Sequence, residues 1–256
     1  MYDYDEVIGV KKDFDRIYAV GDIHGRIPYI FDYLTEEASN SRVAVILLGD
    51  VGANFYLDKR DKKFKKKLND IGVRFYCLRG NHEARPEDIE GMVKAYDEYT
   101  ENVVYYQPEY ENILYLIDGQ EYFFNGLSCL ALGGAYSVDK WYRLERGWTW
   151  FPNEQLNSEE RQAISKEVNG NFYNIVLSHT CPYSWQPTDL FLDVVDQDTV
   201  DNSTEMWLED IAKDIQWDKW LYAHYHQTRK IDEHRVMMLS DDTLLDLIDW
   251  YDIYLK

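Results

Sequence analysis

Asp22 and His24 stand two positions apart at the end of a short apolar run, and both side chains can bind a metal ion. Alternate residues of extended backbone point to the same side of the chain, so one ion can reach both groups. The flanking glycines, Gly21 and Gly25, let the backbone turn tightly around such an ion. A carboxylate and an imidazole together suit divalent manganese, iron or zinc. The pair alone is a weak signal, because Asp-x-His is a common spacing.

An apolar run followed by potential ligands occurs at four further places in the chain. These runs and the residues that follow them are 43–48 with Asp50, 73–78 with Asn81 and His82, 173–177 with His179, and 220–222 with His224 and His226. Five of the six histidines therefore lie at the ends of apolar runs, and only His234 does not. Histidines scattered among loops and core positions would rarely show this pattern, so the sequence favours one shared metal site.

These runs must be the elements that position the ligands. Runs of this length, rich in Val, Ile, Leu and Tyr, are typical of buried strands in a sheet that is covered on both faces. Segments with helical periodicity lie between most of them, which predicts a β-α-β alternation. In open α/β sheets the ligand site lies at the carboxyl ends of the strands. We therefore expect five strands to bring their polar ends to one edge.

The ordered motifs GDIHG (21–25), GD (49–50), GNHE (80–83), SH (178–179) and AHYH (223–226) resemble those of the calcineurin-like metallophosphoesterases. The combination spans residues 17–226 and is highly specific, although each motif alone is not. The resemblance implies an α/β fold, a four-layer αββα sandwich in which helices flank two mixed β-sheets, with a dimetal site at the carboxyl ends of strands. It also implies a dimetal-dependent phosphoester hydrolase, in which hydroxide held between the ions attacks phosphorus in line.

The resemblance also implies roles for individual residues. By motif, Asp22, His24 and His226 bind the first ion, Asp50 bridges both ions, and Asn81, His179 and His224 complete the second site. The implied cofactors are two divalent metal ions, with Mn²⁺ preferred and iron or zinc as alternatives. His82 resembles the family's histidine that binds no metal and instead protonates the leaving group or binds a transition-state oxygen. Asp50 and His82 are thus the predicted catalytic residues.

Two positions depart from the family pattern. Ala53 stands where many members carry an aspartate directed toward the histidine of GNH. His82 therefore takes another carboxylate as its partner, such as Glu83, or works without one as a weaker general acid. Ala223 replaces the usual glycine before His224, which adds only a methyl group.

Three arginines are candidate substrate contacts. Arg79 precedes GNHE, as in the branch of protein phosphatases and dinucleoside tetraphosphate hydrolases, but the GDxxDRG phrase of that branch is absent after Asp50. Arg143 and Arg146 belong to an aromatic and arginine-rich insert, 136–153. This insert is either a lip that grips phosphate oxygens through guanidinium donors or a purely structural feature, and the two readings stay open.

The remaining segments predict the rest of the fold. The expected strands are an edge strand at 7–10, several antiparallel strands of a second sheet over 103–135, and closing strands over 235–255. The expected helices are 28–39, the basic segment up to residue 68, 87–99, 157–168 after a capping box of Asn157 and Glu160, and 204–216. The loop 181–199 is expected to form a wall of the cleft.

Length and composition limit the class of protein. A chain of 256 residues with 45% apolar content can bury one large core, which predicts a single domain over 1–256. No stretch approaches the roughly 18 apolar residues of a membrane span, and the N-terminus lacks the apolar region of a secretory signal. Three cysteines without CxxC spacing (Cys77, Cys129 and Cys181) favour reduced thiols and a cytoplasmic location.

The net charge of −20 disfavours nucleic acid and anionic membranes as partners. The basic run 59–67 is either a solvated helix face or a patch for a phosphate polymer. The leading function is a phosphomonoesterase acting on a phosphoprotein or a small molecule. The alternatives are a phosphodiesterase, a nucleotide or dinucleoside polyphosphate hydrolase, and a catalytically weak binding or scaffold protein that keeps the fold. The expected partner is a phosphorylated substrate, and the oligomeric state stays open.

Overall fold

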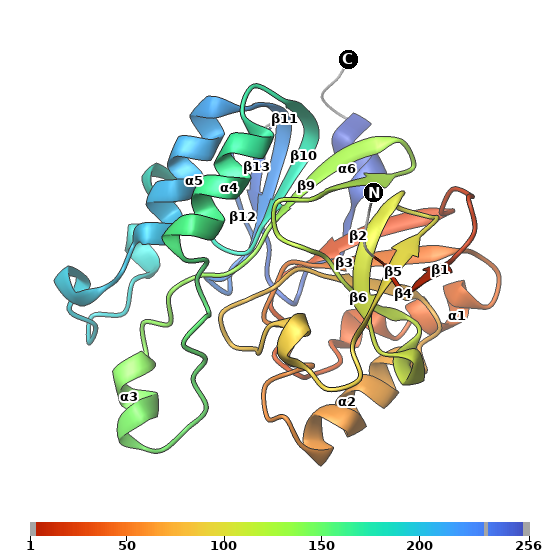
Figure 1. The fold of residues 1–256 in the computed structure, drawn as a ribbon, viewed down its shortest axis with the longest axis horizontal. Helices are drawn as coiled ribbons and strands as arrows, with labels where there is room; N and C mark the ends of the chain where they lie inside the picture. The colour runs from red at the N-terminus through yellow and green to blue at the C-terminus, as the bar shows by residue number, and fades with distance from the viewer. Residues whose placement is uncertain (1–3, 233–234, 253–256) are drawn as a thin grey trace.

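Two mixed β-sheets lie face to face in the computed structural model, which describes residues 4–232 and 235–252 (Figure 1). The first sheet has eight strands, and its β2, β3, β4 and β7 run parallel to one another. In spatial order its strands are β1 (Glu6–Ile8), β5 (Val93–Asp97), β6 (Asn102–Tyr106), β7 (Ile113–Tyr115), β4 (Arg74–Cys77), β3 (Val43–Leu47), β2 (Arg16–Val20) and β14 (Leu245–Asp246). Every residue of β3 is buried, as expected for a strand that is covered on both faces.

The second sheet has six strands, of which β9, β10, β11 and β13 are parallel. In spatial order its strands are β12 (Arg229–Asp232), β13 (Val236–Met238), β11 (Gln216–Tyr222), β10 (Phe172–Ser178), β9 (Leu127–Leu132) and β8 (Glu121–Phe124). The outer strands β8 and β12 pair antiparallel with their neighbours. His234 lies outside the described residues.

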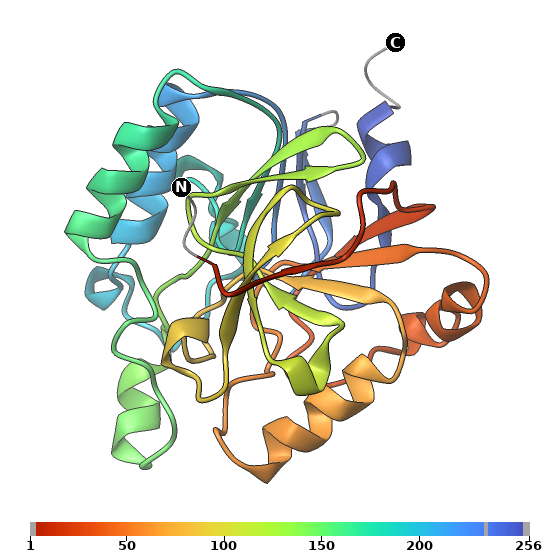
Figure 2. The same ribbon diagram turned by 45° about the vertical axis from the view of Figure 1, so that its right-hand side comes forward.

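Helices cover the outer face of each sheet (Figure 2). On the first sheet these are α1 (Leu34–Ala38) and α2 (Lys59–Asn69), whose apolar residues join one core cluster with β2, β3 and β4. On the second sheet they are α4 (Ser158–Val168) and α5 (Ser203–Asp214), which bury their apolar residues against β10 and β11. A third cluster fills the space between the sheets. The order helix, sheet, sheet, helix confirms the predicted αββα sandwich.

Two further helices lie apart from these layers. α6 (Leu247–Asp252) packs against β2. α3 (Lys140–Glu145) sits at the end of the insert 136–153, which projects from the body of the sandwich (Figure 1). Short 3₁₀ turns in the described ranges are η1 (Tyr29–Phe31), η2 (Pro86–Asp88), η3 (Pro108–Tyr110), η4 (Tyr183–Trp185), η5 (Thr188–Leu190) and η6 (Gln197–Thr199). None of the helices in residues 4–232 and 235–252 is long and apolar enough to cross a bilayer.

Several local predictions are confirmed. Asn157 caps α4 by accepting from the backbone N–H groups of Glu159 and Glu160, and the Glu160 carboxylate accepts from the Asn157 backbone in return. The predicted edge strand is β1, and the predicted basic helix is α2. The three cysteines are buried and free, as predicted for reduced thiols. Each of these features depends on a short stretch of sequence.

The prediction for 103–135 was partly wrong. β6 and β7 from this segment join the first sheet, and only β8 and β9 enter the second. The second sheet is also largely parallel rather than antiparallel, because β9 pairs with β10. Short β-type runs reveal strands but not their partners, which are fixed by contacts distant in sequence.

Two further segments were predicted in the wrong conformation. Residues 87–99, predicted as a helix, form the end of η2 and then β5, where buried Ala95 and Asp97 alternate with partly exposed neighbours at the period of a strand. The predicted closing strands over 235–255 are β13, the two-residue β14 and then α6, and residues 253–255 lie outside the described residues. Leu247, Trp250 and Tyr251 are buried at spacings of three and four, which suits a helix.

The other helix limits differ by smaller amounts. The predicted helix 28–39 is divided into η1 and α1. The predicted helix 204–216 is α5, which ends at Asp214, because Gln216 already begins β11. Met206, expected on the apolar face of that helix, is exposed.

Candidate metal centre

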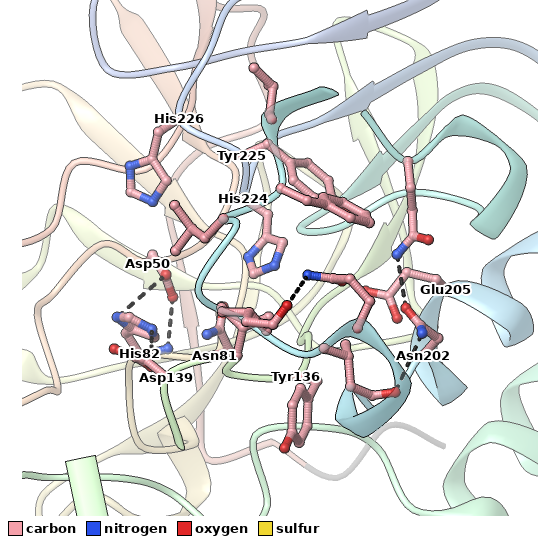
Figure 3. Close-up of a pocket in the computed structure, with 18 residues that line it drawn as sticks. Asp50, Asn81, His82, Tyr136, Asp139, Asn202, Glu205, His224, Tyr225 and His226 are labelled. Atoms are coloured by element: carbon pink, nitrogen blue, oxygen red, sulfur yellow. Dashed lines mark hydrogen bonds and ion pairs between the residues drawn. The ribbon is translucent and has the colours of Figure 1, made fainter. Parts of the chain in front are cut away.

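The predicted ligands follow strands of both sheets. Asp22, Asp50 and Asn81 follow β2, β3 and β4 of the first sheet, whereas His179 and His224 follow β10 and β11 of the second. Because the strands within each group are parallel, their carboxyl ends lie at one end of the sandwich. We predicted that all five strands would end at one edge of a sheet. They instead belong to two sheets, and the site lies where the carboxyl ends of both sheets meet. Figure 3 shows part of this site.

Asp50 belongs to two clusters of ligand-type groups. In the first, its Oδ2 lies 3.9 Å from His24 Nε2 and 4.0 Å from His82 Nδ1. In the second, its Oδ1 lies 3.7 Å from His179 Nε2, and His179 Nδ1 lies 3.5 Å from Asp22 Oδ1. The two oxygens of one carboxylate thus face different clusters, as a residue shared between two ions must.

Ring nitrogens converge in a way that favours a cation. His24 Nε2 and His226 Nε2 lie 3.3 Å apart on parallel rings. His179 Nδ1 lies 2.7 Å from the carbonyl oxygen of Leu48, so this nitrogen carries the proton. His179 Nε2 then directs a lone pair at Asn81 Oδ1, 2.9 Å away. Lone pairs that face each other at this distance suit a positive ion bound by both.

Asp22 also favours a bound cation, because its carboxylate lacks hydrogen-bond partners. Its side chain is buried, and neither carboxylate oxygen has a hydrogen-bond partner among the described residues. Burial and the nearby charge of Asp50 raise the pKa of Asp22 well above its ordinary value. A buried, unpartnered carboxylate beside a second carboxylate is costly unless a cation binds there. The residues therefore fit two divalent ions.

The imidazoles are held in the neutral form that a metal ligand requires. Burial lowers the pKa of His24 to about 4, although the charge of Asp50 opposes this shift. Burial also lowers the pKa values of His179, His224 and His226.

The backbone at the site is strained. His24, Asp50, His224 and His226 have φ angles of 44°, 46°, 69° and 54°, in the left-handed region that non-glycine residues seldom adopt. Four of the seven such residues in the described ranges are thus predicted ligands. Glycines leave room beside them, since a Cβ at Gly49 would overlap the His179 ring and one at Gly80 would overlap Asp50. Strain concentrated in this way is typical of functional sites.

Asn81 is oriented by a chain of hydrogen bonds. Its Nδ2 donates to Ser137 Oγ at 2.8 Å, and the Ser137 hydroxyl and backbone N–H donate to the Glu154 carboxylate. This contact turns Asn81 Oδ1 toward His179. Both supporting residues belong to the region around the insert, and sequence reasoning missed them.

His82 has an acidic neighbour that the sequence analysis did not identify. Asp139 Oδ1 lies 3.9 Å from His82 Nε2. Asp139 also accepts a 2.7 Å hydrogen bond from Arg143 Nε, and Arg143 Nη2 approaches His82 Nδ1 at 3.1 Å. The predicted candidate Glu83 is buried and instead accepts from the backbone N–H groups of Val51 and Gly80. The insert therefore places a carboxylate near His82, where Ala53 provides none.

The three candidate arginines have different surroundings. Arg79 is buried, and its guanidinium donates to Asp118 and to the carbonyl oxygens of Glu154 and Gly133. All of its nitrogens are thus engaged, so the assignment of Arg79 as a substrate contact is corrected to a structural role. Arg146 is exposed and lies over the rings of Tyr142 and Trp148 rather than at the metal centre. Only Arg143 of the three lines a pocket beside the predicted ligands.

The predicted ligands lie between two unlike cavities. One, of about 370 Å³, is lined by Asp50, Asn81, His82, His224 and His226 and otherwise mainly by apolar groups (Figure 3). Its apolar wall comes largely from the loop after His179, as the sequence predicted. The other, of about 620 Å³, is lined by His24, His82 and His226 together with Arg26, Arg60 and Arg143. His82 and His226 line both cavities.

Glu205 of α5 lines the apolar cavity and is itself almost fully buried. Desolvation raises the pKa of this carboxyl from 4.5 to about 7, although hydrogen bonds from the backbone and Thr180 oppose the shift. Between pH 4.5 and about pH 7, Glu205 therefore keeps its proton in the folded protein but loses it in the unfolded chain. Stability from the neutral Glu205 is present below the unfolded pKa and decreases as the pH rises toward 8.

We expect the Glu205→Gln variant to gain stability relative to the wild type as the pH rises. Its free energy of unfolding, minus that of the wild type, should increase by up to about 3 kcal/mol between pH 5 and pH 8. Urea unfolding with a metal chelator at both pH values measures this difference. Glu209→Gln is a matched control on the same helix, because hydrogen bonds from Ser184 lower the pKa of Glu209. An equal Glu205→Gln difference at the two pH values would contradict the expectation.

The chain is similar to a known family along most of its length. A family model described as calcineurin-like phosphoesterase matches residues 15–228. Among solved structures, TT1561 of Thermus thermophilus is 15% identical, with a TM-score of 0.44 over 92% of this chain and 96% of that one. Phosphopantetheinyl hydrolase from Mycobacterium tuberculosis is 11% identical, with a TM-score of 0.42 over 89% of this chain and 90% of that one. A comparison with curated proteins gives no match.

Proposed function

The chain belongs to the calcineurin-like phosphoesterase family and is a metal-dependent phosphoesterase, and we propose that its substrate is a phosphate monoester. The observation that carries the proposal is the contrast between the two cavities at the ligands. A monoester has a dianionic phosphoryl group at one end and an organic group at the other. The arginine-lined cavity suits the first, and the apolar cavity suits the second.

We assign the ligands as the motifs suggest. Asp22, His24 and His226 would hold one ion, Asp50 would hold both, and Asn81, His179 and His224 would hold the other. When bound, the ions supply an activated water and positive charge that stabilises the developing phosphoryl oxygens. Carboxylate, amide and imidazole donors together suit Mn²⁺, which we propose as the native metal. The three buried free thiols support a cytoplasmic location.

His82, Arg143 and Asp139 would act on the substrate side of the ions. His82 borders both cavities, so its imidazole can protonate the leaving oxygen as the ester bond breaks. Arg143 can donate to a phosphoryl oxygen, and Asp139 holds its guanidinium in place. Asp139 is a positioning residue for both neighbours. The complete donor set and this arrangement favour an enzyme over a binding protein that only keeps the fold.

A second candidate is a phosphoanhydride or diester whose far substituent is itself anionic, such as a nucleotide polyphosphate. The size of the arginine-lined cavity favours it, since about 620 Å³ exceeds what one phosphoryl group fills. A diester with two apolar substituents fits less well, because its second substituent would lie against arginines. Within the basic run 59–67, Arg60 lines this cavity, and Lys62, Lys63, Lys66 and Lys67 are exposed elsewhere on α2.

Hydrolysis of 4-nitrophenyl phosphate and of its bis-ester, measured side by side with Mn²⁺, tests the proposal. We expect kcat/KM for the monoester to exceed that for the bis-ester by at least about tenfold, because only the monoester carries two negative charges into the arginine-lined cavity. The double variant Arg26→Gln/Arg60→Gln should lower the monoester value more than the bis-ester value. Arg42→Gln is the control, because Arg42 pairs with Asp15 on the surface outside both cavities. A preference for the bis-ester would overturn the monoester assignment.

A further inference from the structure

The wall of the apolar cavity contains a buried carboxyl group, that of Glu205. Its walls include Leu190, Phe191, Val195 and Val200 from the loop before α5, and Tyr225 from the segment after β11 (Figure 3). Glu205, the third residue of α5, lies at the inner wall of this cavity and is only 4% exposed. A carboxyl group placed among apolar walls is costly to bury, so its presence needs a reason.

One of the two oxygens of the Glu205 carboxyl is hydrogen-bonded within the protein. Thr180 Oγ1 donates to Glu205 Oε1 at 2.9 Å. Oε2 is equally buried but has no hydrogen-bond partner among the described residues. An acceptor that is left unpaired in this way costs stability.

Three other polar side chains of this wall have hydrogen-bond partners. Gln186 Nε2 donates to Asn202 Oδ1 at 3.0 Å, and Asn202 Nδ2 donates to the carbonyl oxygen of Val200. Tyr225 approaches Thr180 Oγ1 through its hydroxyl. Among the described residues that line this cavity, Glu205 Oε2 and Asp139 Oδ1 are buried side-chain oxygens without a hydrogen-bond partner. Asp139 Oδ1 lies beside His82 at the metal centre, which leaves Glu205 to meet the organic group.

We propose that this cavity binds the organic group of the phosphoester substrate, and that this group is an apolar body carrying a hydrogen-bond donor that meets Glu205. The cavity runs from Glu205 to Asp50, Asn81, His224 and His226, so a group seated in it stays attached to phosphorus at the ions. A volume of about 370 Å³ suits a single ring with a short substituent. An ammonium or an amide N–H is the matching donor chemistry. The inference rests on the proposed function, because it names the substrate class of the same site.

Three aryl phosphates of similar shape test the donor requirement. They are tyramine O-phosphate with an ammonium group, 4-ethylphenyl phosphate with none, and 4-(2-carboxyethyl)phenyl phosphate with an acceptor. At pH 8, where most of the Glu205 carboxyl is ionised, we expect the wild type to prefer the ammonium substrate over the ethyl substrate by about tenfold or more in kcat/KM, a typical effect of one charge-assisted hydrogen bond. Glu205→Gln keeps the acceptor for Thr180 and places a donor at the Oε2 position. This variant should lose the preference for the ammonium substrate, and its kcat/KM for the carboxylate substrate should be higher than that of the wild type.

A binding measurement separates this inference from the proposed function. Calorimetric titration of the chelator-treated protein with tyramine and with 4-ethylphenol compares the two organic groups without any catalysis. We expect tyramine to bind more tightly to the wild type, and the difference to disappear in Glu205→Gln but to persist in the control Glu209→Gln. Equal binding of both compounds, or an unchanged difference in Glu205→Gln, would overturn the inference even if monoesters are hydrolysed. Donor-dependent binding without hydrolysis of any ester would instead overturn the proposed function.

Discussion

The Asp50→Asn variant is expected to lose at least about 10³-fold in kcat/KM and to release at least one metal ion. Among the described residues, Asp50 is the carboxylate that belongs to both ligand clusters, with Oδ2 toward His24 and Oδ1 toward His179. Asparagine keeps one oxygen but replaces the other with an NH₂ group, which cannot bind a cation. One cluster must then lose its central ligand, whichever way the amide turns.

Metal content by mass spectrometry and turnover of 4-nitrophenyl phosphate on the same preparation measure both effects. Asp97→Asn is the matched control, because Asp97 is also fully buried but pairs with Tyr76 and Thr100 away from the site. This control should keep its metal and its activity, even if it is less stable. Turnover by Asp50→Asn with two ions still bound would contradict the shared-ligand assignment.

The His82→Ala variant is expected to lower kcat by about 10²-fold to 10⁴-fold while both ions remain bound. His82 borders both cavities and approaches Asp139 and Arg143, which is the position of a group that transfers a proton. Its ring also lies 4.0 Å from Asp50 Oδ2, within one of the ligand clusters. Loss of an ion from His82→Ala would therefore show that His82 is a ligand rather than an acid.

The Asp139→Asn variant extends this test to the positioning residue. If Asp139 acts through His82, its loss should lower kcat about tenfold or more, shift the pH profile of kcat, and add little when combined with His82→Ala. Substrates with a good leaving group, such as 4-nitrophenyl phosphate, should be affected less than alkyl phosphates, because they need less protonation. A purely structural role for Asp139 would give additive losses and an unchanged pH profile.

The layers, and the grouping of the candidate ligands at the ends of strands, were predictable because their signals are local. Each predicted ligand lies within a few residues of the end of a strand, so short motifs locate it without knowledge of the strand pairing. The capping box at Asn157 and the alternation of helical and extended runs are equally local. These signals do not depend on which strands pair with each other.

The errors involve contacts between distant residues. Arg79 was a candidate substrate contact because nothing in its neighbourhood reveals that Asp118, Gly133 and Glu154 enclose it. The Asp139 carboxylate was missed because the insert approaches His82 only in the folded chain. β5 was taken as a helix because the acidic residues before it imitate a helix start, whereas its pairing with β1 and β6 decides its conformation.

The placement of ligands on both sheets has a consequence for the order of folding. His24 and His226 lie side by side although they are 202 positions apart, and Asn81 meets His179 across 98 positions. Contacts of such long sequence separation close late, after local and neighbouring-strand contacts have formed. A newly made chain therefore has no complete metal site until both sheets are in place. We therefore expect metal uptake to follow the formation of both sheets, and the bound ions to stabilise the contact between the two sheets.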